Sequence, residues 1–115
     1  MFTPKRGSIC WVDFDTVGAR GHEQKGRRPA IVTSEDAYNH KTGRCFIFPV
    51  TTKGKNPLAV EIPDGSCSIS GFILSDQGRT IDWKARWDES EFTDEVILDE
   101  TLDLAIATHV AILGY

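Results

Sequence analysis

The sequence predicts a mainly β fold with a single C-terminal helix. Short apolar runs, rich in β-branched and aromatic residues, are separated by segments containing glycine and proline, as in short strands joined by turns. Only the segment after Thr93 repeats its apolar residues at intervals of three and four, the period of an α-helix. A chain of 115 residues suffices for one hydrophobic core. We therefore expect one domain over residues 1–115.

Five to seven short strands are expected. Ser34 can cap a single helical turn, and Pro29, which lacks an N–H group, belongs at the start of a strand. The first strand has apolar residues on both faces, which suits a small curled barrel better than an open sheet. An SH3-like small barrel capped by the C-terminal helix fits this count. The expected strands cover residues 7–15, 29–33, 44–50, 58–62 and 68–74, and residues 76–86 have mixed character.

The C-terminal helix is predicted to begin just after Thr93. Threonine is a good N-cap, and Asp94 and Glu95 favour the positive end of a helix. Apolar residues from Leu98 to Leu113 then line one face of the predicted helix. Gly114 is placed to end it.

The cysteines and histidines predict no cofactor. Cys10, Cys45 and Cys67 are widely spaced, so they do not form a disulfide framework, and with three histidines they give no spacing typical of a zinc site. Cys10 and Cys45, each within an apolar run, are expected to be small core residues. The sequence contains neither a run of about 18 apolar residues nor a signal peptide, so we expect a cytoplasmic protein without membrane contact.

Charge is distributed unevenly along the chain. Residues 1–87 hold all 13 lysines and arginines against 9 acidic residues, a net charge of +4. Residues 88–115 hold 8 acidic residues and no lysine or arginine, a net charge of −8. The basic part can attract a polyanion although the whole chain is acidic.

The most unusual segment runs from Gly18 to Pro29. Its three glycines predict a flexible loop between two strands, and Glu23 is its only acidic residue. A basic loop of this kind can simply be a solvated surface, but it also has the groups needed to bind a phosphate ester. Those groups are the cations Arg20, Lys25, Arg27 and Arg28, the imidazole of His22 and the carboxamide of Gln24.

Four blocks of sequence resemble the MazF/PemK family of toxin endoribonucleases, the mRNA interferases of type II toxin–antitoxin systems. The blocks are Gly21–Ala30, Gly7–Asp15, Pro49–Thr52 and Asp76–Arg86, which span nearly the whole chain in the order that the family shows. Together they are far more specific than any one of them. The resemblance implies the small barrel shared by the CcdB, PemK and MazF toxins.

The resemblance also implies three catalytic residues. Arg28, before Pro29, matches the family's catalytic arginine, and its planar guanidinium suits two phosphate oxygens at once. Thr51 matches the functional first threonine of its pair, although a threonine at a strand end can also cap a turn. Glu23 is expected to orient Arg28 or to accept a proton. His22 is a residue type suited to proton transfer near neutral pH, and the PemK branch uses a histidine in this loop for catalysis beside an aspartate that Asp76 matches.

That branch also uses an arginine at the position where this chain has Leu74, so the Arg28–Thr51 arrangement is favoured here. Asp76–Gln77 can alternatively be a structural turn. Trp11, Trp83 and Trp87 could stack on bases, but the alternation along its strand favours a core position for Trp11, and Trp83 and Trp87 could instead fill a subunit interface. The residues expected to bind RNA are His22, Gln24, Lys25, Arg27, Arg20, Lys53, Lys55, Asp76, Gln77 and Arg79.

The function implied by the resemblance is metal-independent cleavage of single-stranded mRNA at a short motif. Attack by the substrate's own 2′-hydroxyl would leave a 2′,3′-cyclic phosphate and a 5′-hydroxyl. The expected partners are mRNA, a second copy of the chain in a homodimer, and a MazE-like antitoxin whose acidic, disordered tail occupies the RNA site. The alternatives are a non-enzymatic, CcdB-like toxin that binds DNA gyrase, and a peptide-binding SH3-like adapter.

Overall fold

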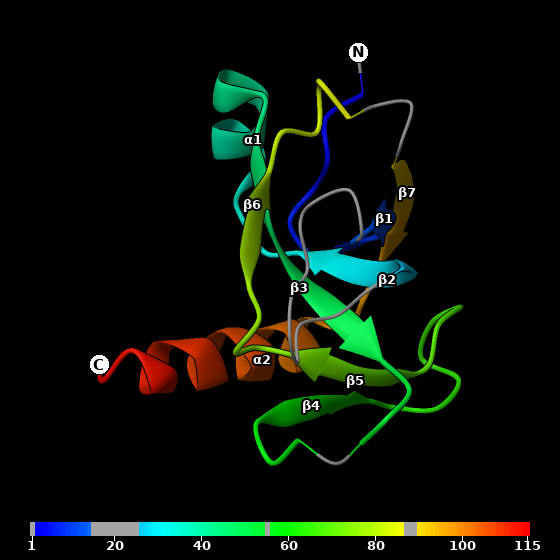
Figure 1. Cartoon of the computed structure of the whole chain (residues 1–115), viewed down its shortest axis with the longest axis vertical. Helices are drawn as coiled ribbons and strands as arrows, with labels where there is room; N and C mark the ends of the chain where they lie inside the picture. The colour runs from blue at the N-terminus through cyan, green and yellow to red at the C-terminus, as the bar shows by residue number, and fades with distance from the viewer. Residues whose placement is uncertain (1, 15–25, 55, 87–89) are drawn as a thin grey trace.

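The computed structural model describes residues 2–14, 26–54, 56–86 and 90–115. Within these residues the chain forms seven strands and two helices (Figure 1). In chain order they are β1 (Ser8–Asp13), β2 (Arg27–Val32), α1 (Asp36–Thr42), β3 (Cys45–Thr51), β4 (Ala59–Ile62), β5 (Gly71–Leu74), β6 (Arg79–Ile81), β7 (Glu91–Val96) and α2 (Asp99–Ile112).

The strands form one curled antiparallel sheet in the order β4-β5-β3-β2-β1-β7, with β6 also paired to β3. β3 is the hub, because its start pairs with β6, its middle with β2 and its end with β5. No backbone ladder joins β4 to β7 among the described strands. Glu95 on β7 instead accepts hydrogen bonds from the N–H and hydroxyl of Ser68, in the segment between β4 and β5. The predicted fold, a mainly β small barrel with a C-terminal helix, is confirmed.

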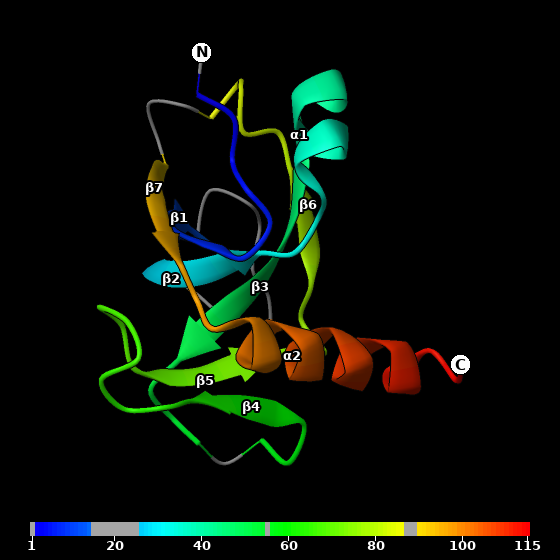
Figure 2. The same cartoon turned by 180° about the vertical axis from the view of Figure 1, so that it is seen from behind.

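Two groups of buried residues fill the curled sheet. One group lies between the sheet and α2, which runs above β5 and β4 in the view of Figure 2, and it includes Phe48 and Leu102. The other includes Phe14, Cys10 and Cys45. Burial raises the pKa of the Cys45 thiol to about 12 and raises the pKa of Cys10 well above its usual value. Both thiols therefore stay protonated at neutral pH and serve as small core residues, as predicted.

The predicted start of the C-terminal helix is wrong. Thr93 lies within β7, where its hydroxyl donates to the Ile9 carbonyl over 2.6 Å. α2 begins at Asp99 after Leu98, which makes no side-chain cap. Residues 91–96 gain backbone pairing with β1, and that long-range gain outweighs the local preference of threonine and acidic residues for a helix start. Neither described helix is long and apolar enough to cross a membrane.

The predicted capping role of Ser34 is also wrong. α1 begins one residue after Glu35, and the Ser34 hydroxyl accepts the Phe46 N–H over 2.8 Å. The side-chain amide of Asn39, which is buried in α1, donates a hydrogen bond to the Pro4 carbonyl. The backbone carbonyl of Asn39 accepts a hydrogen bond from the Trp83 indole N–H over 2.9 Å. Trp83 is only 3% exposed, so its predicted roles in base stacking or a subunit interface are wrong. Trp87 lies outside the described residues.

Candidate functional site

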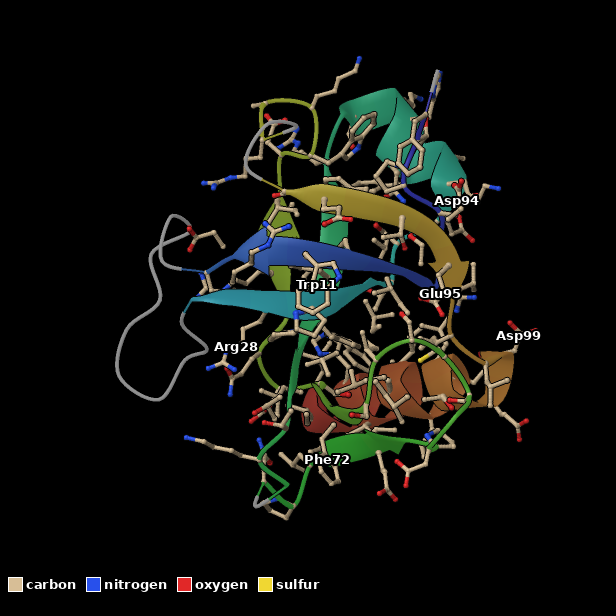
Figure 3. All side chains as sticks on the ribbon, turned by 90° about the vertical axis from the view of Figure 1, so that its right-hand side faces the viewer. Trp11, Arg28, Phe72, Asp94, Glu95 and Asp99 are labelled. Atoms are coloured by element: carbon tan, nitrogen blue, oxygen red, sulfur yellow. The ribbon has the colours of Figure 1, made fainter. Side chains whose placement is uncertain are left out.

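The two arginines of the candidate site are the first two residues of β2. Arg27 lies opposite Asp13 and Arg28 opposite Val12 in the ladder with β1, and both arginines are exposed. Their backbone is thereby fixed by the sheet while their side chains reach solvent. Figure 3 shows the Arg28 side chain projecting from the start of β2. A guanidinium on a fixed strand loses less entropy on binding a phosphate than one on a free chain.

Thr51 lies on the neighbouring strand, at the end of β3. Ala30 pairs with Pro49, Ile31 with Phe48 and Val32 with Ile47. Arg28 lies two residues before the first paired residue of β2, and Thr51 lies two residues after the last paired residue of β3. Thr51 is 9% exposed, and its hydroxyl oxygen accepts a hydrogen bond from the Lys53 backbone N–H over 3.2 Å. The pairing of β2 with β3 therefore puts the two predicted catalytic residues on neighbouring strands, although they are 23 residues apart in sequence.

A hollow of about 310 Å³ opens beside Arg28. We call it the Trp11 hollow, because the half-buried Trp11 packs against the core and also lines this space. The sequence pattern placed Trp11 in the core, and only part of the ring is there. Thr52, not Thr51, is the threonine at the wall of the hollow. The lining residues are Trp11, Arg27, Arg28, Pro29, Thr52, Ser68, Ile69 and Ser70.

Arg27 is held by an ion pair across the sheet. Its guanidinium lies 3.1 Å from the Glu91 carboxylate on β7, and the two side chains are 49% and 63% exposed. Exposed pairs of this kind contribute at most about 1 kcal/mol. An RNA phosphate can therefore compete with Glu91 for Arg27 at little cost, which is consistent with the predicted role of Arg27 in RNA binding.

Asp76 and Gln77 lie in the turn between β5 and β6. The Gln77 N–H donates to the Leu74 carbonyl over 3.1 Å, which confirms the structural-turn interpretation. The Asp76 carboxylate accepts from the Asn56 side-chain amide at 3.2 and 3.3 Å. Because Asn56 belongs to the same β3–β4 connection as Lys53, this contact ties the two predicted RNA-binding segments together. Neither Asp76 nor Gln77 lines the Trp11 hollow.

The remaining predicted residues are only partly placed. Arg79 is half-buried, and its guanidinium carbon lies 6.0 Å from the centre of the Phe14 ring, within range of a cation–π contact. Six predicted residues lie outside the described part of the chain: Arg20, His22, Glu23, Gln24, Lys25 and Lys55. In the residues that the structure does describe, no three His, Cys, Asp or Glu side chains gather as metal ligands would.

Some residues at the site had no signal in the sequence. Ser68, Ile69 and Ser70 belong to an irregular segment between β4 and β5, where the sequence predicted part of a strand. They line the hollow because β5 pairs with β3, which also pairs with β2, so the segment before β5 belongs to the same curled sheet as β1 and β2. Alternation along β1 does place Trp11 on the same face as Ile9 and could have indicated its neighbours. The meeting with residues 68–70 depends on the whole sheet.

Comparison with known proteins identifies the family. Residues 5–111 match the model of the PemK-like, MazF-like toxin of type II toxin–antitoxin systems. Two Escherichia coli relatives are similar in sequence. The endoribonuclease toxin MazF of strain K12 is 41% identical over 85 residues, which cover 74% of each chain. The endoribonuclease PemK is 35% identical over 103 residues, which cover 85% of this chain and 76% of that relative.

Solved structures agree with the sequence match. The crystal structure of MazF from Deinococcus radiodurans superposes with a TM-score of 0.85 at 34% identity, and the match covers 100% of both chains. A MazE–MazF crystal structure from the same organism gives a TM-score of 0.78 at 30% identity, covering 99% of this chain and 98% of that one. The chain therefore belongs to the endoribonuclease toxins of the PemK-like, MazF-like family of type II toxin–antitoxin systems.

Proposed function

We propose that this chain cleaves single-stranded mRNA without a metal ion, using the 2′-hydroxyl of the substrate as the nucleophile. The observation that supports this most strongly is that Arg28 and Thr51 lie on the neighbouring strands β2 and β3, with Arg28 also lining the Trp11 hollow. A bidentate cation and a hydroxyl on adjacent strands suit one phosphodiester group. They fix its position before reaction, which is where much of the catalytic effect of such sites originates.

The reaction proceeds by in-line transfer within the substrate. The 2′-oxygen forms a bond to phosphorus and loses its proton to the general base, for which Glu23 is our candidate. The bond from phosphorus to the 5′-oxygen then breaks, and that oxygen takes a proton from the Arg28 guanidinium, our candidate general acid, which recovers one from solvent as Glu23 releases its own. The products are a 2′,3′-cyclic phosphate and a 5′-hydroxyl. Arg28 binds the non-bridging oxygens, whose charge grows in the pentacovalent transition state, and the Thr51 hydroxyl holds the phosphate in line.

The proposed partners follow from the same surface. The D. radiodurans relative forms MazE–MazF complexes, and we expect a MazE-like antitoxin here. An acidic, disordered antitoxin tail would compete with RNA for Arg27 and Arg28, because carboxylates and phosphates bind the same guanidinium groups. We also expect a homodimer that acts on cytoplasmic mRNA. The family match favours this function over the CcdB-like alternative of a gyrase-binding toxin.

A cleavage assay in EDTA tests the proposal. We expect the purified chain to cut a long single-stranded RNA into discrete fragments with the chelator present, because no step above needs a divalent ion. Fragment ends are read by mass spectrometry as cyclic phosphates, with a heat-denatured sample as the control. If cleavage appears only after magnesium is added, the proposed chemistry is wrong. DNA breaks that depend on gyrase would support the CcdB-like alternative instead.

A further inference from the structure

The Trp11 hollow has the walls of a binding site for one flat ring. Trp11 on β1 lies directly opposite Pro29 on β2, and Ile69 lines the same space. An indole with aliphatic neighbours is the surface on which unstacked nucleic-acid bases rest. Arg27 and Arg28 line the same hollow. A base bound there would therefore belong to a nucleotide whose phosphate reaches the arginines.

Hydrogen bonds around Ser68 give the hollow a chemical preference. The Glu95 carboxylate accepts the Ser68 backbone N–H over 2.8 Å with one oxygen and the Ser68 hydroxyl with the other. An ionised carboxylate can only accept, so the single proton of the Ser68 hydroxyl is directed to Glu95. The Ser68 oxygen is then left with lone pairs for other partners. Figure 3 shows Trp11 lying between Arg28 and Glu95 in that view, and Ser68, which is hydrogen-bonded to Glu95, lines the same hollow.

We propose that the Trp11 hollow is a base-specificity pocket, in which Trp11 stacks on one nucleobase and the Ser68 oxygen accepts from its exocyclic amino group. The inference rests on the proposed function, because it assigns a recognition site to that RNA substrate. Adenine and cytosine carry such an amino group on their outer edge, and uracil carries a carbonyl there. The pocket therefore selects an amino-bearing base over uracil at one position of the RNA.

Glu95 sets this preference without touching the base. The backbone N–H of Ser68 can only donate a hydrogen bond. In a Glu95→Gln variant it therefore bonds to the carbonyl oxygen of the new glutamine side chain. The new NH₂ group then faces the Ser68 hydroxyl and donates to it. The hydroxyl proton is released to point into the pocket, where it suits the carbonyl of uracil. Glu95→Gln should thus move the preference toward uracil, whereas Ser68→Ala should only abolish it.

The test uses 2′-O-methylated oligo(A), oligo(C) and oligo(U), which bind without being cut, with affinity measured by fluorescence anisotropy. We expect the wild type to bind oligo(A) and oligo(C) about 2- to 10-fold tighter than oligo(U), the value of one neutral hydrogen bond. Trp11→Ala should weaken binding of all three by about 5- to 150-fold, and Trp11→Phe should recover most of the loss. Ser66→Ala, in the same segment but outside the hollow, is the matched control and should bind as the wild type does.

The outcomes separate this inference from the proposed function. The same variants are assayed for cleavage of unmodified RNA. If the wild type cuts RNA but Trp11→Ala and Ser68→Ala keep wild-type affinity and base preference, the base pocket is wrong and the proposed function stands. If Trp11-dependent, base-selective binding is seen without cleavage, the pocket stands and the cleavage chemistry fails. Trp11-dependent binding of an acidic peptide, with no base preference in RNA, would also overturn the pocket.

Discussion

Arg28→Ala should lower the cleavage rate constant by about 100- to 1,000-fold, the loss seen when one preorganised charge-stabilising donor is removed. The additional negative charge on the phosphate oxygens that Arg28 binds develops only in the transition state. Removing the guanidinium should therefore lower kcat far more than it lowers the affinity for uncleavable RNA. Arg28→Lys should keep most of the defect, since an ammonium group cannot bind two phosphate oxygens in one plane. Single-turnover kinetics on a fluorescent RNA, with anisotropy for binding, measure both effects.

A suitable control is Arg44→Ala, which removes an exposed arginine outside the hollow, next to the start of β3. Its kcat should stay within about 2-fold of wild type, because loss of one remote charge changes mainly the encounter with RNA. Arg27→Ala should weaken RNA binding more than it lowers kcat. An Arg28→Ala variant that retains near-wild-type kcat would remove Arg28 from the mechanism.

The largest effect on stability is expected for Gly71→Ala. Gly71 begins β5 at φ +125°, a conformation that side chains rarely adopt, and the Thr51 carbonyl oxygen occupies the place that a new Cβ would need. The substitution must therefore strain the backbone and also push apart β3 and β5 where Thr51 pairs with Phe72. We expect the free energy of unfolding to fall by about 3 kcal/mol or more, as measured by urea denaturation.

Gly65→Ala separates the two causes. Gly65 also has a positive φ, +76°, but apart from its two chain neighbours no residue has a heavy atom within 4 Å of the position its Cβ would take. This variant should lose only about 1–2 kcal/mol, the cost of a left-handed backbone alone. Equal losses in the two variants would show that the contact with Thr51 carries no weight. In the folded fraction of Gly71→Ala we also expect slower cleavage, because Thr51 must move.

Local sequence patterns predicted most of the fold. Alternation and turn residues indicated the strands, and the period of Leu102 and Ala105 indicated the helix. The segment around Thr93 was misread because its local chemistry favours a helix start, whereas its hydrogen bonds come from β1, more than 80 residues away in sequence. Local preferences cannot register a partner at that distance.

The sequence likewise predicted some residues of the candidate site and missed others. Arg28 and Thr51 could be named from short motifs, and the antiparallel pairing of β2 and β3 explains why the motifs meet. Trp11 was assigned to the core because alternation shows which face a side chain is on but not whether that face is fully covered. The role inferred for Ser68 depends on its contact with Glu95, which joins segments 27 residues apart. No local pattern predicts such a contact.

The central claim is that the RNA supplies its own nucleophile and that Arg28 stabilises the resulting transition state. The most direct measurement uses an RNA oligonucleotide with one 2′-deoxyribose at the cleaved nucleotide, incubated with the wild-type chain in EDTA. We predict that this oligonucleotide binds with unchanged affinity and is not cut, while the all-ribose version gives a 2′,3′-cyclic phosphate. Cleavage of the deoxy-substituted bond at a comparable rate would contradict the account, because the nucleophile would then have to come from water or from the protein.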